Sequence, residues 1–146
     1  MGSEMCIRDS PWRYRFDAPP EGWTAPEFDD AAWTEGPGGF GSEGTPGAVV
    51  RTSWTTPEIW LRRAFELEVE PDAKLFLDVH HDEDVEVYLN GVLAAQAEGY
   101  TTAYEPLAIA PEARASLAKG RNTLAIHCRQ TRGGQYVDAG IVRQER

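Results

Sequence analysis

Apolar and polar residues alternate with a period of two along much of the chain, which is the pattern of β-strands that bury one face. The clearest stretch, residues 75–92, predicts two strands separated by an acidic turn at residues 82–84. Asn90 and Gly91 follow, a pair suited to the positive φ angles of a tight hairpin, and residues 92–95 return as a third strand. This part of the sequence predicts a meander of three strands.

The same alternation predicts further strands at residues 12–16, 59–67, 122–128 and 136–142. Helical character is confined to residues 111–117, a short turn that ends near Gly120. About seven or eight strands with almost no helix predict an all-β fold. We expect an antiparallel two-sheet β-sandwich rather than a parallel α/β sheet.

A long stretch, residues 22–56, is rich in glycine and proline and shows no alternation. A connection of this length is usually either functional or a packed cover on the sandwich. Its aromatic residues favour the packed cover, because large rings are seldom left in water; they are Trp23, Phe28, Trp33 and Phe40.

Length and composition fit one domain of a globular protein: 146 residues, 41% hydrophobic and 26% charged. The formal net charge of −10 argues against nucleic acid or an anionic membrane as a partner, because phosphate binding needs clustered Lys and Arg. No apolar run approaches the roughly 20 residues that a membrane span requires. Neutral ligands and cations remain open as partners.

Residues 1–10 neither join the later pattern nor have the form of a signal peptide, and no targeting segment is visible. They resemble an in-frame translation of a transposon-end adapter from a sequencing library, as in a metagenomic fragment. We therefore assign residues 1–10 as non-native and residues 11–146 as the domain, and expect that the natural sequence before Pro11 is missing. Only Cys128 then remains of the two cysteines, so neither an internal disulfide nor a paired-cysteine metal site is predicted.

Three blocks of sequence carry a family resemblance. The first is Phe-Asp-Asp-Ala-Ala-Trp at residues 28–33, and the second is Ile-Trp-Leu-Arg-Arg-Ala-Phe at residues 59–65. The third joins the Asn-Gly hairpin of residues 81–91 to Gly-Arg-Asn-Thr-Leu-Ala-Ile at residues 120–126. In order and spacing they resemble the sugar-binding domain of glycoside hydrolase family two and its galactose-binding-like relatives. The resemblance implies a jelly-roll sandwich that is extracellular or periplasmic.

The resemblance also implies a non-catalytic role in carbohydrate metabolism, as a carbohydrate-binding or substrate-positioning accessory module of a larger secreted enzyme. The partner would be a carbohydrate or a neighbouring catalytic domain, because the family's catalytic carboxylates lie in a separate domain. The alternative is a purely structural module that packs against and stabilises that domain. An exposed apolar patch around Trp54 and Trp60, without a concave polar pocket, would favour the alternative.

Catalysis by the chain itself is not predicted. The sequence contains no nucleophile elbow, phosphate loop or metalloprotease motif. Asp78 and Glu86 would provide two carboxylates at a hydrolase-like separation if their strands pair, a coincidence that any acidic sandwich can supply.

Strand alternation groups polar and aromatic side chains on the face opposite the core, a combination suited to sugar hydroxyls and C–H faces. The other interpretation is a solvated or domain-facing sheet surface with ion pairs. The predicted face consists of Trp60, Arg62, Asp78, His80, Glu86, Tyr88, His127 and Arg129.

A glycine-containing loop at one rim of the sandwich provides a second candidate surface. Its polar and aromatic residues would form either a shallow sugar site or a docking edge for the catalytic domain. The candidates in the loop are Gln130, Arg132, Gln135 and Tyr136, joined by Trp54, Tyr100 and Tyr104.

No cofactor is predicted apart from a candidate structural calcium. Asp82 and Asp84 belong to the acidic turn, and carboxylates are ligands that Ca²⁺ prefers. A solvated acidic turn is the other interpretation, since the spacing lacks the glycine and distal Glu of an EF-hand. His80 and His81 point to opposite faces of a strand, so they do not readily chelate one zinc ion.

Overall fold

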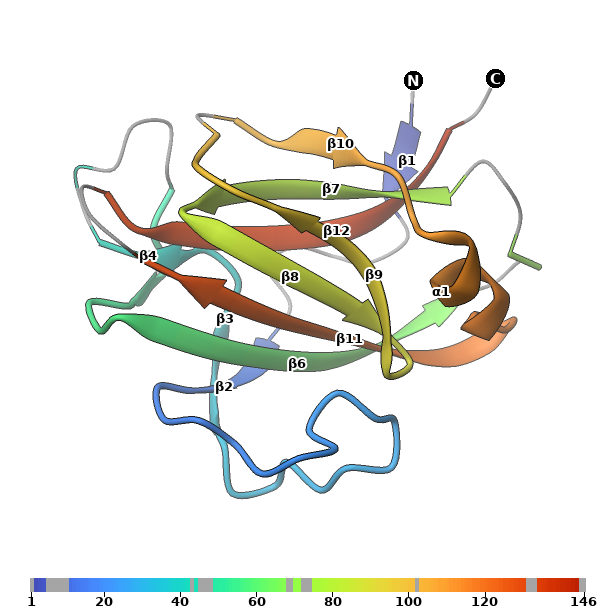
Figure 1. The fold of residues 1–146 in the computed structure, drawn as a ribbon, viewed down its shortest axis with the longest axis horizontal. Coiled ribbons are helices and arrows are strands. Elements are labelled where there is room, and N and C mark those ends of the chain that lie inside the picture. The colour runs from blue at the N-terminus through green and yellow to red at the C-terminus, as the bar shows by residue number, and fades with distance from the viewer. Residues whose placement is uncertain are drawn as a thin grey trace.

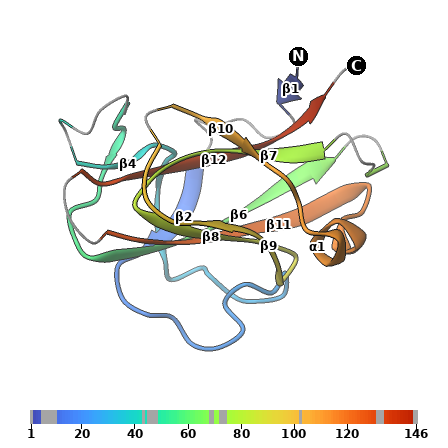
Figure 2. The same ribbon diagram turned by 45° about the horizontal axis from the view of Figure 1, so that its top comes forward.

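A computed structural model of the chain describes residues 2–4, 11–42, 44, 49–67, 70–71, 75–101, 103–130 and 134–144. Two β-sheets face each other across a single core, as Figure 1 and Figure 2 show. Among these described residues, every strand pairing is antiparallel except that of β4 with β5. The predicted all-β sandwich is confirmed.

Sheet I has the strand order β10-β7-β12-β4-β5, with β1 beside β12. Its strands are β1 (Gly2–Glu4), β4 (Phe40–Gly41), β5 (Thr52–Ser53), β7 (Leu75–Asp82), β10 (Glu105–Leu107) and β12 (Tyr136–Gln144).

Sheet II has the strand order β3-β2-β6-β11-β8-β9. Its strands are β2 (Pro11–Arg15), β3 (Thr34–Pro37), β6 (Glu58–Leu67), β8 (Asp84–Leu89), β9 (Val92–Ala97) and β11 (Gly120–Arg129). The short helix α1 (Pro111–Ser116) packs beside β8 and β9 and begins with Pro111, whose fixed φ suits the first turn of a helix.

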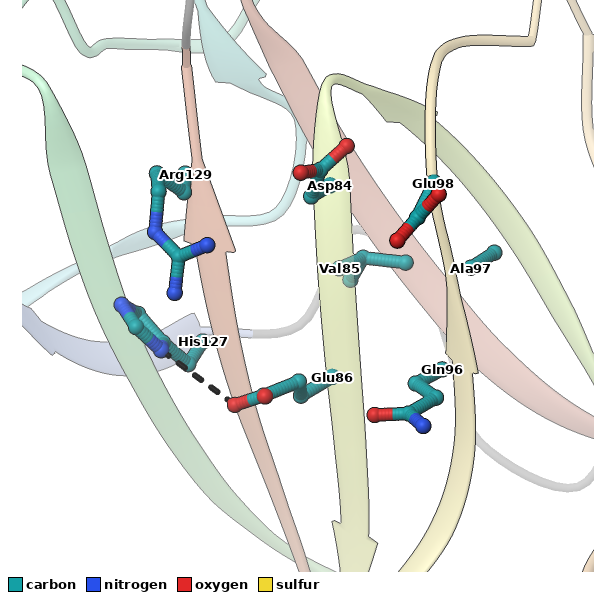
Figure 3. Close-up of a pocket in the computed structure, with 8 residues that line it drawn as sticks. All are labelled: Asp84, Val85, Glu86, Gln96, Ala97, Glu98, His127 and Arg129. Carbon is teal, nitrogen blue, oxygen red and sulfur yellow. Dashed lines mark hydrogen bonds and ion pairs between the residues drawn. The ribbon is translucent and has the colours of Figure 1, made fainter.

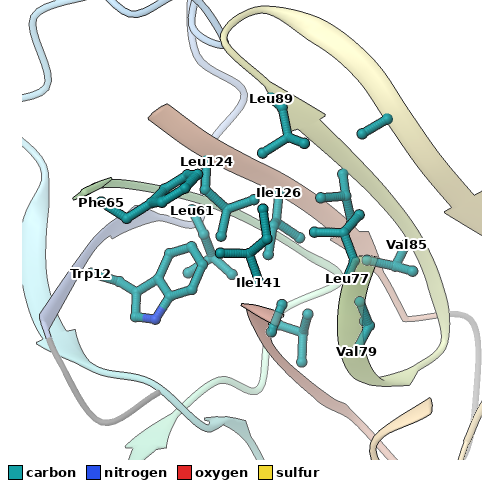
Figure 4. Close-up of a cluster of buried hydrophobic side chains, with 14 of the residues drawn as sticks. Trp12, Leu61, Phe65, Leu77, Val79, Val85, Leu89, Leu124, Ile126 and Ile141 are labelled. Atoms are coloured by element: carbon teal, nitrogen blue, oxygen red, sulfur yellow. The ribbon is translucent and has the colours of Figure 1, made fainter. Parts of the chain in front are cut away.

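The core lies between the sheets and consists of the alternate residues of each strand that face inward (Figure 4). Burial of these apolar side chains is the main force that holds the two sheets together. They include Trp12, Leu61, Phe65, Leu77, Val79, Val85, Leu89, Leu124, Ile126 and Ile141.

The predicted meander of residues 75–95 exists as three strands, but they do not lie in one sheet. β7 belongs to sheet I, and the chain crosses at Glu83 so that β8 and β9 belong to sheet II. Alternation is the same in either sheet, so the pattern could not reveal the crossing. The predicted order of strands and turns is therefore present, but the first strand is separated from the other two by the core.

The predicted Asn90-Gly91 hairpin is confirmed between β8 and β9. Both residues have positive φ, 50° and 88°, which a two-residue hairpin turn needs. The Asn90 amide donates to the Ser116 carbonyl and to Asn122 Oδ1, while its own oxygen accepts from the Thr123 backbone. The turn is thereby tied both to α1 and to β11.

Residues 17–33, here called the capping loop, cross the outer face of sheet II near β2 and β6 (Figure 1 and Figure 2). Trp33 is buried and contacts the rings of Trp23 and Phe28, with centroids 6.4 and 5.9 Å away. The expected packed cover is therefore present. Phe40 differs from the expectation, because it is a core residue in β4.

The N-terminal segment contributes one strand to the described structure. Gly2–Glu4 pairs with the end of β12, from Glu4 opposite Val142 to Gly2 opposite Gln144. The assignment of residues 1–10 as non-native stays a prediction. Within the described residues, no helix combines the length and the apolar character that crossing a membrane would take.

Candidate functional site

The face predicted from alternation is divided between the two sheets. Asp78 and His80 lie on β7 in sheet I, where they pair with Gly140 and Asp138 of β12. The remaining residues of the predicted face lie on sheet II, across the core from these two. Asp78 and Glu86 are not on paired strands, so the carboxylate pair considered for a hydrolase is not formed in this way.

A row of side chains crosses the outer face of sheet II from β2 to β9. Strand register places its members opposite one another in the order Arg15, Trp60, His127, Glu86 and Gln96. The Trp60 and His127 rings stack with centroids 4.7 Å apart and planes 7° apart. The row therefore begins with the cation of Arg15 and an aromatic stack and ends with the carboxylate of Glu86 and the amide of Gln96.

His127 lies between two carboxylates. Its Nε2 is 2.6 Å from Glu58 Oε1, and its Nδ1 is 3.4 Å from Glu86 Oε1. The Tyr88 hydroxyl also donates to Glu86 Oε1 at 3.3 Å, and burial together with the charge of Glu86 raises the pKa of that hydroxyl. These contacts orient the imidazole and the Glu86 carboxylate over the sheet surface.

A hollow of about 420 Å³ opens beside this row, over β11, β8 and the end of β9. Figure 3 shows the Glu86 carboxylate directed toward His127, with Gln96 on the neighbouring strand β9 and Glu98 just beyond the end of β9. Arg129 Nε lies 3.9 Å from Glu58 Oε1 at the other side. We call this hollow the polar groove; its polar lining is Asp84, Glu86, Gln96, Glu98, His127 and Arg129.

Arg62 belongs to the covered part of the same face. Its side chain is buried, with 4% of the residue exposed, and it donates to Asp30 Oδ2 at 2.8 Å. It also donates to three backbone carbonyls of the capping loop, at residues 23, 25 and 28, and its guanidinium lies 5.2 Å from the Phe28 ring. Arg62 therefore anchors the capping loop with four of its five N–H donors and is too deeply buried to present the surface of a ligand site.

Tyr88 is also partly covered by this loop. The Trp23 ring meets the Tyr88 ring edge-on at 5.8 Å. A second hollow of about 390 Å³ lies at the other end of the loop, between Tyr14, Arg15 and Trp33. The Arg15 guanidinium lies 5.8 Å above the Trp33 ring, so that ring is already engaged.

The rim site predicted from the sequence is not assembled by the described residues. Trp54 has no exposed surface and lies in the core, so it is not a surface plate for a sugar. Tyr100 is 64% exposed, and its backbone forms an isolated antiparallel β-bridge with Asp82. Gln130 is held through its backbone to the Pro57 carbonyl at 2.8 Å.

Two further members of that prediction are occupied within the fold. The Gln135 amide donates to the Thr56 carbonyl at 2.6 Å, and the Tyr136 hydroxyl donates to the Val49 carbonyl at 3.0 Å. Arg132 lies outside the described residues. Ligand binding at this rim stays a prediction.

His80 and Tyr104 form a buried cluster on sheet I with Tyr136 and Asp138. The Tyr104 hydroxyl donates to Asp138, and the His80 ring lies 5.5 Å from Tyr104 and 4.6 Å from Tyr136. Burial lowers the pKa of His80 and raises the pKa of both tyrosines. His80 is 1% exposed and Tyr136 is 1% exposed, so these two members of the cluster present no surface to a ligand, while Tyr104, just before β10, is half-buried.

The candidate calcium ligands lie at the crossing between the sheets. Asp82 ends β7 and Asp84 begins β8, where its Oδ1 accepts from the Gly99 backbone at 2.9 Å. Burial, reinforced by the charge of Glu83, raises the pKa of Asp82 to about 6. The described residues contain no cluster of three His, Cys, Asp or Glu side chains that could hold a metal ion. A structural calcium here stays a prediction without a ligand set to support it.

Sequence reasoning missed Glu58, Gln96 and Glu98 as members of this surface. Glu58 faces Arg129 only because β6 and β11 pair in a particular register, which links residues distant in sequence. Gln96 faces Glu86 only because a register shift follows Val87 in the pairing of β8 with β9. A local pattern carries no signal for either pairing.

No protein-family model matches the sequence, and no curated protein matches it either. Solved structures do match. A β-glucuronidase from glycoside hydrolase family 2 aligns with a TM-score of 0.61 and 16% identity over 96% of this chain. The Bacteroides uniformis β-glucuronidase aligns with a TM-score of 0.65 and 18% identity over 97% of this chain. The β-glucuronidase from Ruminococcus gnavus in complex with D-glucaro 1,5-lactone aligns with a TM-score of 0.63 and 14% identity over 98% of this chain.

The chain spans only 17%, 18% and 29% of the lengths of these three proteins. At this level of identity the likeness establishes the fold. The jelly-roll sandwich expected from the three sequence blocks is thus confirmed, because it matches a β-sandwich portion of glycoside hydrolase family 2 structures.

Proposed function

We propose that this chain is a non-catalytic accessory module of a larger secreted glycoside hydrolase-like enzyme, and that it binds carbohydrate or positions substrate at the outer face of sheet II. The observation that carries the proposal is the polar groove beside the Trp60–His127 stack. Its carboxylate, amide, imidazole and guanidinium groups provide the acceptors and donors that sugar hydroxyls require. Catalysis would belong to another domain, since the solved enzymes are more than three times as long as this chain's matching part.

The arrangement of apolar surface favours this proposal over a purely structural module. Trp54 and Trp60 are 0% and 8% exposed, so they do not form the apolar patch that docking of a domain at this place would need. The large apolar residues that are exposed in the described structure lie on separate segments; they are Phe16, Val49, Leu93 and Tyr100. A concave polar surface is present instead, over β8, β9 and β11.

Calorimetric titration with neutral mono- and disaccharides at millimolar concentration tests the binding part of the proposal. We expect saturable binding that Gln96→Ala weakens, because Gln96 is an exposed member of the groove. Lys119→Ala, at an exposed site near the end of α1, is the matched control and should leave affinity unchanged. If no saccharide gives saturable binding, the carbohydrate-binding part of the proposal is wrong and the structural module is the function that remains.

The non-catalytic part has a separate test. Purified chain should leave chromogenic glycosides unhydrolysed under conditions in which it binds saccharide. Turnover that follows the protein through purification and disappears in Glu86→Gln would show that the groove is an active site.

A further inference from the structure

The polar groove has a surplus of negative charge. Three carboxylates line it against one guanidinium, which leaves a formal charge of −2, or −1 when His127 is protonated. Glu58 adds a further carboxylate, whose Oε1 lies 2.6 Å from His127 Nε2 and 3.9 Å from Arg129 Nε. The groove is negative in either protonation state of His127, so an anionic ligand is repelled in both.

The groove also has a surplus of hydrogen-bond acceptors. A neutral imidazole has one N–H, yet His127 contacts two carboxylates, with Nε2 2.6 Å from Glu58 Oε1 and Nδ1 3.4 Å from Glu86 Oε1. In the neutral form one of these two contacts therefore lacks a proton. A ligand donor beside His127 and Glu86 would supply a hydrogen bond there, whereas a ligand carboxylate would add a further acceptor.

An ammonium group matches both surpluses. It carries three N–H donors and no acceptor, and its charge is opposite to that of the groove. Resting on the proposed carbohydrate-binding function, we propose that the polar groove selects sugars with a free, protonated amino group over the corresponding neutral and uronate sugars. Glu86 is the member of the groove best placed to receive the ammonium, and Glu98 on the facing side adds to the attraction.

The selectivity can be measured with four ligands that share one ring: glucosamine, glucose, N-acetylglucosamine and glucuronate. Glucosamine should bind about fivefold more tightly than glucose, the upper range for one exposed ion pair. N-acetylglucosamine should match glucose, and glucuronate should bind most weakly. The advantage of glucosamine should shrink from 0.02 to about 0.5 M salt, because screening acts on exposed charges.

Two charge-neutralising variants locate the effect. Glu98→Gln and Glu86→Gln should each reduce the ratio of glucosamine to glucose affinity at least about twofold. Glu112→Gln removes the same charge from an exposed position on α1 and should leave the ratio unchanged, which separates a local effect from general attraction to an acidic protein. Binding of glucose with equal or weaker binding of glucosamine, or an unchanged ratio in both groove variants, would overturn the inference while preserving the proposed function. If none of the four monosaccharides binds, the inference is overturned, and the proposed function is then decided by the titrations with the other saccharides.

Discussion

Replacing Arg62 with alanine should release the capping loop from sheet II. In the folded protein the Arg62 guanidinium holds four acceptors at once: the Asp30 carboxylate and the carbonyls of residues 23, 25 and 28. Alanine removes all four donors and leaves the loop carbonyls facing an apolar gap beside the Phe28 ring. The loop would then be stable only if it moved away and exposed those carbonyls to water.

The magnitude follows from the burial of the contacts. Removing one partner of a fully buried ion pair costs about 3–5 kcal/mol, but the Asp30 side chain is 26% exposed, which reduces that cost. Each backbone hydrogen bond contributes about 0.5–1.5 kcal/mol, and opening of the loop limits the sum. We expect a loss of about 3 kcal/mol in the free energy of unfolding, which for a domain of this size lowers the Tm by roughly 6–12 °C.

Urea denaturation followed by tryptophan fluorescence measures the loss, and limited proteolysis locates it. New cleavage should fall within residues 17–33, while the sandwich stays resistant. Arg62→Lys keeps the charge but not the planar fork, so it should recover only part of the stability. Arg121→Ala, at an exposed position of β11, is the matched control and should change stability by less than about 0.5 kcal/mol.

Two results would refute this reasoning. A loss below about 1 kcal/mol in Arg62→Ala would mean that the four contacts do not hold the loop. An unchanged cleavage pattern would mean that the loop is fixed by its aromatic packing alone, through Trp23, Phe28 and Trp33.

Three further predictions concern other parts of the fold. Because the folded pKa of Asp82, about 6, lies above its ordinary value of 3.8, Asp82 favours the folded state below about pH 4, and this contribution is lost as the pH rises to about 6. The gain in stability from Asp82→Asn, measured by urea melts, should therefore grow across that interval to about 1–3 kcal/mol at pH 7, and a gain independent of pH would contradict it. Asn122→Ala removes a buried amide that is hydrogen-bonded to Asn90 and to the backbone of residues 118 and 120. The free energy of unfolding should therefore fall by about 2–3 kcal/mol, and a fall of less than about 0.5 kcal/mol would contradict the prediction. Burial raises the pKa of the Cys128 thiol. In a Cys6→Ser chain, a thiol reagent at pH 8 should therefore label Cys128 only in denaturant. Rapid labelling of the folded protein would show that the core opens around Cys128.

The strands and the hairpin could be predicted from the sequence because their causes are local. Alternation located β7, β8 and β11, and Asn90-Gly91 fixed the turn through its positive φ angles. The aromatic residues of the 22–56 stretch indicated a packed cover for the same reason, since an exposed ring is costly wherever it lies. Such features depend on the residue itself and on its immediate neighbours.

The division of residues between the two sheets could not be predicted in this way. Alternation continues unchanged from β7 to β8, although the chain changes sheets at Glu83 and carries His80 away from His127. The turn-rich segment around Trp54 predicted a surface aromatic, yet the Trp54 side chain itself lies in the core. In both cases the determining contacts come from residues far away in the sequence.

Arg62 and His127 show how the outer face of sheet II divides into a covered and an open part. Both residues alternate with core residues and both are polar, so the sequence places them in one surface. The capping loop, whose nearest anchor Asp30 stands more than 30 residues before Arg62, occupies four of the five N–H donors of Arg62, while His127 stays at the edge of the polar groove. Substitutions under the loop should therefore act on stability, and substitutions in the groove should act on binding. A groove variant such as Gln96→Ala that lowered stability as much as Arg62→Ala would show that the open part is structural as well, and would remove the basis for placing a ligand there.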